Sequence, residues 1–413
     1  MSSPRHDPYA ALRHAPFRRL ITANLLLSTG VLIQAVVLGY ALYQMTHDPL
    51  ALGLIGLAEA VPFIGLALFG GHLADRREKT RLMQMAGAVI AAGSALLLCA
   101  TLPSTQAMLS QPVTLGIIYT SVFMLGLARG IYSPASASLR PFLIPREIYS
   151  NSASWNATFF QAGAIAGPVL AGFLYVGVGL TGTLIVVLAM VLINIVLIGR
   201  IEKQPVSPPA GIALWASLRE GIAYVWKTKI LLYAISLDMF SVLFGGVVAI
   251  LPIFAEDILK VGPQGLGLLR AAPAAGALIT VIACNWYPPT RRPWSTLLLV
   301  VAGFGVATLA FAVSKTFWLS AAALFASGAF DSVSVVIRNT LLQTLPADHM
   351  RGRVASVNSI FISASNELGA FESGLAAKLL GTVPSVIAGG MATLGVVGYI
   401  WTRSRALFKV RLM

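Results

Sequence analysis

Long apolar runs, separated by short charged segments, constrain the fold of this chain more than any other feature. The stretch from Leu50 to Phe69 contains a single charged residue, Glu59, and another apolar run follows the charged segment 75–81. Runs of about 20 apolar residues are long enough for a helix to cross a hydrocarbon core roughly 30 Å thick, and these lack the alternation of a membrane β-barrel. The sequence therefore predicts an all-α membrane protein.

The positions of these runs predict about twelve transmembrane helices. Hydrophobic residues make up 57% of the chain, charged residues 11%, and the mean hydropathy is +0.81, a composition typical of a protein with many spans. The expected spans are centred near Leu32, Phe63, Ala91, Val122, Ala164, Leu188, Phe240, Ala275, Val306, Phe325, Ser365 and Leu394.

One longer connection, from Ile201 to Lys229, divides the chain into two halves. It begins with the Pro-rich stretch QPVSPPAG, and apolar residues then recur at helical spacing beside Arg219 and Glu220. This pattern predicts a linker followed by an amphipathic helix at the membrane surface. The expected parts are an N-terminal six-helix half (1–200), a cytoplasmic linker with this helix (201–228) and a C-terminal six-helix half (229–413).

Basic residues predict the orientation in the membrane. With the N-terminus in the cytoplasm, 24 of the 29 Lys and Arg residues fall on the cytoplasmic side and two lie in spans. The opposite side receives Lys260, Lys315 and Lys378. We therefore expect both termini in the cytoplasm, with the chain in the inner membrane of a bacterium. Membrane orientation accounts for the net charge of +14, so no nucleic-acid partner is expected.

The two halves also resemble each other in sequence. A single shift of 202 residues aligns three pairs of glycines and one pair of short segments. The pairs are Gly126 with Gly328, Gly167 with Gly369, Gly172 with Gly374, and ASWN at 153–156 with ASVN at 355–358. A shared offset close to half the chain length predicts two pseudo-symmetric six-helix bundles.

The charged segment after the second span resembles the loop signature of the major facilitator superfamily. Gly71, Asp75, Arg76 and Lys79 stand at positions of that signature, and Glu78 replaces its second glycine. The span order, the linker and the duplicated halves resemble the superfamily over essentially the whole chain. The resemblance implies the major facilitator fold and a latch that holds the cytoplasmic side shut in one state. A loop that only fixes orientation is the alternative.

Span 5 carries GAIAGPVLAG, from Gly163 to Gly172, which resembles the antiporter signature of exporters in this superfamily. Gly163 and Gly167 lie on one helix face, so a partner helix can approach closely, and Pro168 lacks an amide donor. The resemblance implies export, and ordinary packing of small residues is the alternative. In span 4, Arg129 stands where these exporters often keep an Arg associated with proton coupling.

Charged residues inside spans are candidates for the chemistry of transport, because each costs roughly 2.5 to 3.5 kcal/mol to insert. They are Glu59, Arg129, Asp238, Arg270, Asp331, Glu367 and Glu372. Under the resemblance, spans 1, 4, 7 and 10 line a central cavity. The residues that we expect to contact the substrate are Gln34, Asp238, Asn24 and Glu59.

A buried acid is expected to couple transport to protons, because a carboxylate without a compensating charge can exchange a proton. The candidates are Asp331, Glu367 and Glu372, with Arg129 as a partner. The shift of 202 residues places Arg129 on Asp331, so an ion pair between these two residues is expected. Fixed structural pairs, such as Arg270 with Glu372, are the alternative for any single residue.

No catalytic, metal or nucleotide site is expected. Cys99 and Cys284 lie in spans of different halves, the five His residues lack metal-ligand spacing, and the sequence has no Gly-x-x-x-x-Gly-Lys phosphate loop. We therefore expect no enzyme activity and no cofactor, with a proton gradient as the energy source.

The combined motifs predict a proton-coupled exporter of a small amphiphilic molecule, which resembles the bacterial branch that exports siderophores and macrolides. We expect a monomer that works in the lipid bilayer by alternating access. The alternatives are a lipid or lysolipid flippase, a facilitator without ion coupling, and a membrane sensor that does not transport.

Cysteine accessibility tests the predicted orientation. In a background with Cys99 and Cys284 replaced by Ser, single cysteines at Arg77, Gln204 and Arg403 should react only with reagents that reach the cytoplasm, because basic loops stay on that side. A cysteine at Pro263 should react from outside. Labelling of the Gln204 position from outside would contradict the assignment.

Overall fold

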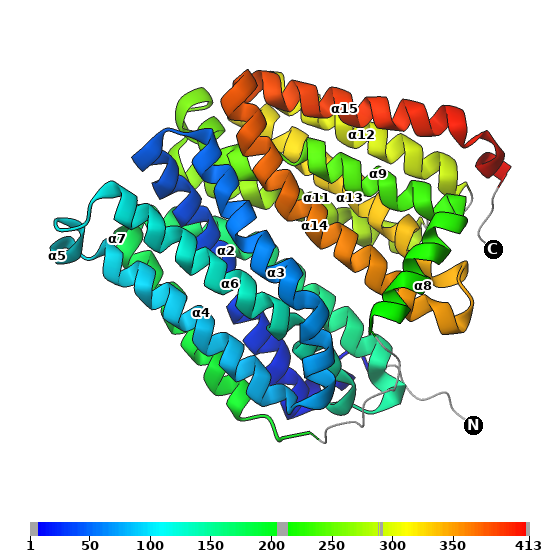
Figure 1. The fold of residues 1–413 in the computed structure, drawn as a ribbon, viewed down its shortest axis with the longest axis horizontal. Helices are drawn as coiled ribbons and strands as arrows, with labels where there is room; N and C mark the ends of the chain where they lie inside the picture. The colour runs from blue at the N-terminus through cyan, green and yellow to red at the C-terminus, as the bar shows by residue number, and fades with distance from the viewer. Residues whose placement is uncertain (1–6, 205–213, 288, 290–291, 410–413) are drawn as a thin grey trace. The chain divides into compact units, whose positions relative to one another are not determined.

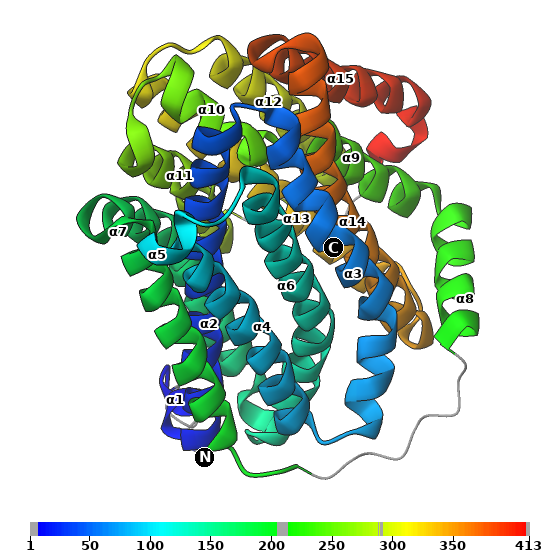
Figure 2. The same ribbon diagram turned by 60° about the vertical axis from the view of Figure 1, so that its left-hand side comes forward.

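The structure is a computed structural model, and it describes residues 7–204, 214–287, 289 and 292–409. All regular elements in this part of the chain are helical (Figures 1 and 2). The long helices are α2 (Ala15–Thr46), α3 (Pro49–Arg76), α4 (Lys79–Thr101), α6 (Gln111–Leu139), α7 (Tyr149–Gly199), α8 (Leu214–Lys227), α9 (Lys229–Gly245), α11 (Gly262–Trp286), α12 (Pro293–Val313), α13 (Phe317–Thr344), α14 (Asp348–Leu380) and α15 (Thr382–Arg403). The short elements are α1 (Ala10–Arg13), α5 (Pro103–Gln106), η1 (Arg140–Phe142), η2 (Arg146–Ile148), η3 (Val247–Ile250), α10 (Leu251–Ile253), the π-helical turn η4 (Phe254–Ile258) and η5 (Arg405–Lys409).

The helices accommodate all twelve expected spans. Ten helices of the described chain are long and apolar enough to cross a membrane. One of these, α7, has 51 residues and covers spans 5 and 6, because Gly179 interrupts it with a φ of 70° that favours glycine. The remaining helix, α14, has 33 residues and covers span 11, and its Ser, Asn and Glu residues make it more polar than the others.

Contacts divide the chain into two compact units. Unit 1 consists of Met1–Leu38 and Val61–Ala210, and unit 2 consists of Gly39–Ala60 and Gly211–Met413. The segment Gly39–Ala60, which we call the α2–α3 tip, belongs to the first half by sequence and to unit 2 by contacts. Helices α2 and α3 therefore each belong partly to one unit and partly to the other.

The same helix pairings recur inside both units. In unit 1, span 5 packs on span 1, where a Cβ added at Gly163 would lie 2.9 Å from Ser28 Oγ. In unit 2, span 11 packs on span 7 in the same way, where a Cβ added at Gly369 would lie 2.9 Å from the Val242 carbonyl oxygen. Contacts between spans 3 and 4 and between spans 9 and 10 also correspond. These pairings fit the duplicated halves expected from the 202-residue shift.

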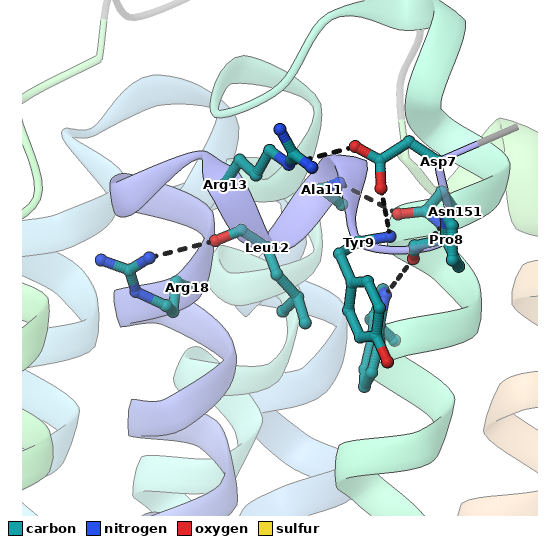
Figure 3. A network of polar contacts seen from close by, with 9 residues as sticks. Asp7, Pro8, Tyr9, Ala11, Leu12, Arg13, Arg18 and Asn151 are labelled. Carbon is teal, nitrogen blue, oxygen red and sulfur yellow. Dashed lines mark hydrogen bonds and ion pairs between the residues drawn. The ribbon is translucent and has the colours of Figure 1, made fainter. Parts of the chain in front are cut away.

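The N-terminal arm docks on the start of α7 within unit 1 (Figure 3). The Pro8 carbonyl accepts hydrogen bonds from Asn151 Nδ2 and Trp155 Nε1, each at 2.8 Å. Asn151 Oδ1 accepts a bond from the Ala11 amide at 3.0 Å, and the Tyr9 ring lies 5.7 Å from the Trp155 ring. These bonds anchor the arm before α2 begins.

Close backbone contact holds α11 and α13 together in unit 2. A Cβ added at Gly328 would collide with the Pro273 carbonyl oxygen, and one added at Gly276 would collide with the Phe325 carbonyl oxygen. Backbone atoms cannot move aside as a flexible side chain can, so this crossing requires glycine on both helices.

Replacing Gly328 by Ala should therefore lower the free energy of unfolding by about 1 to 3 kcal/mol, because the added methyl group overpacks the crossing. Thermal unfolding of the purified protein in detergent measures the change. The matched control is Gly398→Ala on α15, where an added Cβ meets nothing within 4 Å. Equal melting temperatures for the two variants would contradict the assigned packing.

Candidate functional site

A polar network joins three helices inside unit 1. Tyr132 Oη on α6 donates to Asn24 Oδ1 on α2 at 2.9 Å, and Asn24 Nδ2 donates to Ser136 Oγ at 3.1 Å. Asn194 Nδ2 on α7 donates to Tyr132 Oη at 2.9 Å and to the Ala23 carbonyl oxygen at 2.8 Å. Sequence analysis identified only Asn24, because uncharged polar residues in a span carry a weaker signal than charges do.

Gln34, another expected substrate contact, lies in the helix packing of unit 1. Its side chain on α2 accepts a hydrogen bond from Ser94 Oγ on α4 at 2.7 Å, and the residue is 3% exposed. The Gln34 carbonyl group is therefore used to bind a neighbouring helix.

Arg129 lies on α6 with its guanidinium group over the ring of Phe63, 5.5 Å from the ring centroid. The arginine is exposed on unit 1, and a cation over an aromatic face is favourable at such a distance. Asp331, its expected partner, is half-buried on α13 in unit 2. The ion pair between Arg129 and Asp331 stays a prediction.

The antiporter-like motif of span 5 packs against span 1. A Cβ added at Gly167 would lie 2.8 Å from Leu32 Cβ, and Gly163 meets α2 one turn earlier, beside Ser28. Pro168 and Gly172 are also buried within α7. The small residues therefore bring α7 and α2 into close contact, while Pro168 leaves one amide hydrogen bond of α7 unmade.

The expected latch begins at the end of α3. Gly71 and Asp75 lie on this helix, and their side chains are outside the described part of the structure. Arg76 is exposed, whereas Lys79 is 3% exposed and places its Nζ 4.9 Å from the centroid of the Phe142 ring.

Glu78 has a structural function in the same loop. Its carboxylate accepts hydrogen bonds from the amides of Thr80 at 2.9 Å and Arg81 at 2.7 Å, so it caps the N-terminus of α4. A carboxylate is favourable at the positive end of a helix. The residue that replaces the second glycine of the signature therefore starts the next helix.

A buried ion pair joins α9 and α13 in unit 2. Asp238 Oδ1 bonds Arg338 Nη1, with side chains that are 6% and 2% exposed. The sequence assigns Arg338 to the cytoplasmic side near the end of span 10, and in the structure its side chain is buried inside the helix packing. Asp238, an expected substrate contact, is occupied by this pair.

Arg270 on α11 interacts with two acids within unit 2. It interacts electrostatically with Glu59 on α3 and Glu367 on α14. The alternative partner suggested by the sequence, Glu372, is half-buried on α14 and does not act on Arg270 among the described residues. The structure therefore brings together Glu59, an expected substrate contact, and Glu367, an expected proton carrier.

The α2–α3 tip has its own polar contacts with the rest of unit 2. Tyr40 and Tyr43 donate to Glu256 and Asp257, which are adjacent residues of η4. The π-helical turn widens the helix locally, and such turns are frequent at functional sites.

An ion pair between Lys378 Nζ and Asp48 Oδ2, at 2.7 Å, links the tip to the end of α14. Burial opposes ionisation of Asp48, but hydrogen bonds from Lys378 and the Leu50 amide outweigh it, so the pKa of Asp48 lies below its ordinary value. The pair therefore stays ionised at neutral pH.

No group of three His, Cys, Asp or Glu residues in the described chain is placed to hold a metal ion. Cys99 and Cys284 are free cysteines. The charged and polar groups described above can exchange protons, form ion pairs and accept hydrogen bonds.

Comparison with known families identifies the architecture. The family model described as Major Facilitator Superfamily matches residues 20–370. The chain belongs to the major facilitator superfamily. It is a membrane transporter of small molecules and not an enzyme, as the loop signature and the duplicated halves predicted.

Curated relatives within this superfamily are exporters. The enterobactin exporter EntS of Salmonella typhimurium is 25% identical over 395 residues, which cover 93% of this chain and 91% of the exporter. EntS of Shigella boydii is 23% identical over 392 residues, with 94% and 91% coverage.

Solved structures of superfamily transporters share the fold. A bacterial homolog to the human lysosomal transporter Spinster has a TM-score of 0.74 at 14% identity and covers 99% of each chain. The nucleoside transporter NupG has a TM-score of 0.72 at 12% identity, covering 96% of this chain and all of that chain. These likenesses concern the fold alone.

The Asp238 and Arg338 pair should be essential for the stability of this superfamily member. Asp238→Asn should lower the free energy of unfolding by about 3 to 5 kcal/mol, because it leaves the Arg338 charge buried without a carboxylate. The matched control, Asp48→Asn, breaks a partly exposed pair and should cost about 0 to 1 kcal/mol. Chemical unfolding in detergent measures both changes, and a cost for Asp238→Asn as small as for the control would contradict a buried pair.

Proposed function

We propose that this chain exports a small amphiphilic molecule, such as a siderophore or a drug, by proton antiport. The observation that carries the proposal is the similarity to enterobactin exporters over nine-tenths of both chains. The antiporter-like motif of α7 supports it, since Gly163 and Gly167 pack directly on α2. Export and antiport both require that substrate and proton stabilise different states of the protein.

Proton coupling is assigned to the buried acids, because acids outnumber bases inside the spans. Asp331, Glu367 and Glu372 are the candidate carriers, and Arg129 is the base expected to pair with Asp331. Loss of a proton leaves a carboxylate whose negative charge is stabilised only by a nearby cation or by water. This favours a conformation in which the carboxylate reaches one of them. Rocking of the two halves then exposes the substrate to each side in turn.

The proposed setting is the inner membrane of a bacterium, with both termini in the cytoplasm. The excess of basic residues on one side of the spans supports this orientation. A single chain contains both halves of the transporter, so we propose a monomer with no nucleic-acid partner.

A lipid or lysolipid flippase is the second candidate, and one pocket favours it. Helices α8, α9 and α14 enclose a pocket of about 250 Å³ whose lining includes Trp226, Met239 and Phe361. This mostly apolar lining suits an acyl chain.

Reconstitution into liposomes with an imposed pH gradient tests the proposal. We expect the gradient to drive export of enterobactin or of a member of a dye and drug panel, and lysophospholipid transfer to be slow. Replacing the carrier acid by its amide should abolish gradient-driven export, because the amide mimics the protonated state. Exchange at equal pH should survive, since rocking itself needs no titration.

The variants for this test are Asp331→Asn, Glu367→Gln and Glu372→Gln. Glu220→Gln serves as the control, because Glu220 pairs with Arg353 between α8 and α14, away from the expected carriers. If all three carrier variants retain full gradient-driven export, proton antiport through these residues is wrong. Transfer of lysophospholipid that is independent of pH would instead favour the flippase.

A further inference from the structure

The pocket between α8, α9 and α14 extends along α9 within unit 2. Leu232, Ser236 and Met239 line it at helical spacing, so they lie on one face of α9 over roughly 10 Å. Val357 and Phe361, one turn apart on α14, line it from the neighbouring helix. We call this cavity of about 250 Å³ the α8 pocket. Its length along the helix and its mostly apolar lining fit a hydrocarbon chain.

The lining of the α8 pocket is buried at its base and exposed at its edge. Val225, Ile235 and Val357 are buried in the hydrophobic core of unit 2. Ile222 and Trp226, one turn apart on α8, are 43% and 66% exposed, although both side chains are mainly apolar. An exposed apolar edge beside an apolar pocket marks an interaction site, and the apolar face of an amphipathic helix is covered by lipid in a membrane.

Polar contacts with α14 hold α8 in place beside the pocket. Glu220 forms an ion pair with Arg353, and Tyr224 Oη donates a hydrogen bond to the Leu345 carbonyl oxygen at 3.3 Å. The helices are also in close contact, since a Cβ added at Gly221 would lie 2.9 Å from the Arg353 carbonyl oxygen. The ion pair neutralises the one acid in the sequence of α8, so no uncompensated carboxylate of this helix opposes an anion.

Basic residues lie at the end of the α8 pocket where α8 meets α9. Lys229 precedes Leu232 by one turn and therefore lies on the side of α9 that lines the pocket. Lys227 ends α8, and Arg219 shares a helix face with Ile222. All three basic residues are exposed, and none of them forms an ion pair with another residue of the described chain. An apolar pocket with a positive mouth is complementary to an anionic amphiphile.

We propose that the α8 pocket holds one acyl chain of a phospholipid with an anionic headgroup, which stays bound during transport. The chain lies along α9, and the phosphate group lies at Lys227 and Lys229. Basic residues on an amphipathic helix attract anionic lipids, and the chain of the same lipid can enter the apolar pocket beside them. The lipid fills the space between α8 and α9 and therefore stabilises their packing.

The size of the pocket favours a resident lipid over a transported molecule. Pockets for drug-sized ligands usually measure roughly 300 to 1,000 Å³, so the α8 pocket takes one chain and leaves the headgroup at the surface. In the flippase alternative, a lipid in this pocket is cargo that crosses the membrane, whereas here it is a fixed part of the protein. The inference goes beyond the proposed function and does not depend on export or antiport.

Native mass spectrometry of the purified, delipidated full-length protein tests the headgroup. In an equimolar mixture of phosphatidylglycerol and phosphatidylcholine with the same chains, one phosphatidylglycerol molecule should bind more tightly by about tenfold or more. Lys227→Gln and Lys229→Gln should each weaken its binding about fivefold and leave phosphatidylcholine binding unchanged. The matched control is Lys315→Gln, an exposed lysine between α12 and α13, which should change neither.

A second set of measurements tests the acyl chain. Ser236→Phe should abolish binding of the phosphatidylglycerol molecule, because the added ring fills the pocket. If this variant does not fold, Ile222→Ser at the exposed edge should weaken binding severalfold, since it removes apolar contact without changing the core. Dihexanoyl phosphatidylglycerol, which has the same headgroup and short chains, should bind the wild-type protein more weakly than the long-chain lipid.

The results that would overturn the proposal differ for each part. Equal binding of the two headgroups, or equal effects of Lys229→Gln and Lys315→Gln, would contradict the anionic headgroup. Equal binding of short and long chains would contradict the acyl chain. Displacement of the phospholipid by equimolar oleate would indicate a fatty-acid site, and displacement by enterobactin or a transported dye would indicate a substrate site. Loss of lysophospholipid transfer in Ser236→Phe liposomes would make the lipid cargo.

Discussion

The cost of a charge in lipid governs how the polar residues of this chain are arranged. An uncompensated charge at the centre of a span costs several kcal/mol, so several charged side chains of the spans lie beside an opposite charge or an aromatic ring. Asp238 pairs with Arg338, Arg270 interacts electrostatically with Glu59 and Glu367, and Arg129 lies over the ring of Phe63. Each of these contacts joins two or three helices, so neutralisation of charge also determines which helices pack together.

Small residues supply the other condition for these contacts. Glycine lets the backbones of two helices come close together, as the helix contacts in both units show. Gly56 brings α3 against α14 beside Glu367, and Gly163 brings α7 against α2. In water, the hydrophobic effect drives helices together. In lipid this driving force between helices is absent, so their association depends on close packing and on hydrogen bonds between them.

The sequence predicted the spans and the family more fully than it predicted the site. Hydropathy located the spans of the ten apolar helices, including the two that α7 joins across Gly179, because span length depends on membrane thickness. The rotation of each helix is a property of packing, and this explains why neither the pairing of Arg338 with Asp238 nor the interaction of Glu59 with Arg270 was predicted from the sequence. The structural function of Glu78 was also not predicted. The sequence showed only that this residue replaces a glycine of the family signature, whereas the structure shows that it caps the N-terminus of α4.

The α2–α3 tip is the segment whose contacts change when the two halves rock in the proposed mechanism. By sequence, residues 39–60 are continuous with the first half, yet by contacts they belong to unit 2 with the second half. In the proposed mechanism the halves rock, so the bonds that the tip makes in unit 2 must break in the other state. Those bonds include Asp48 with Lys378 and Tyr43 with Asp257.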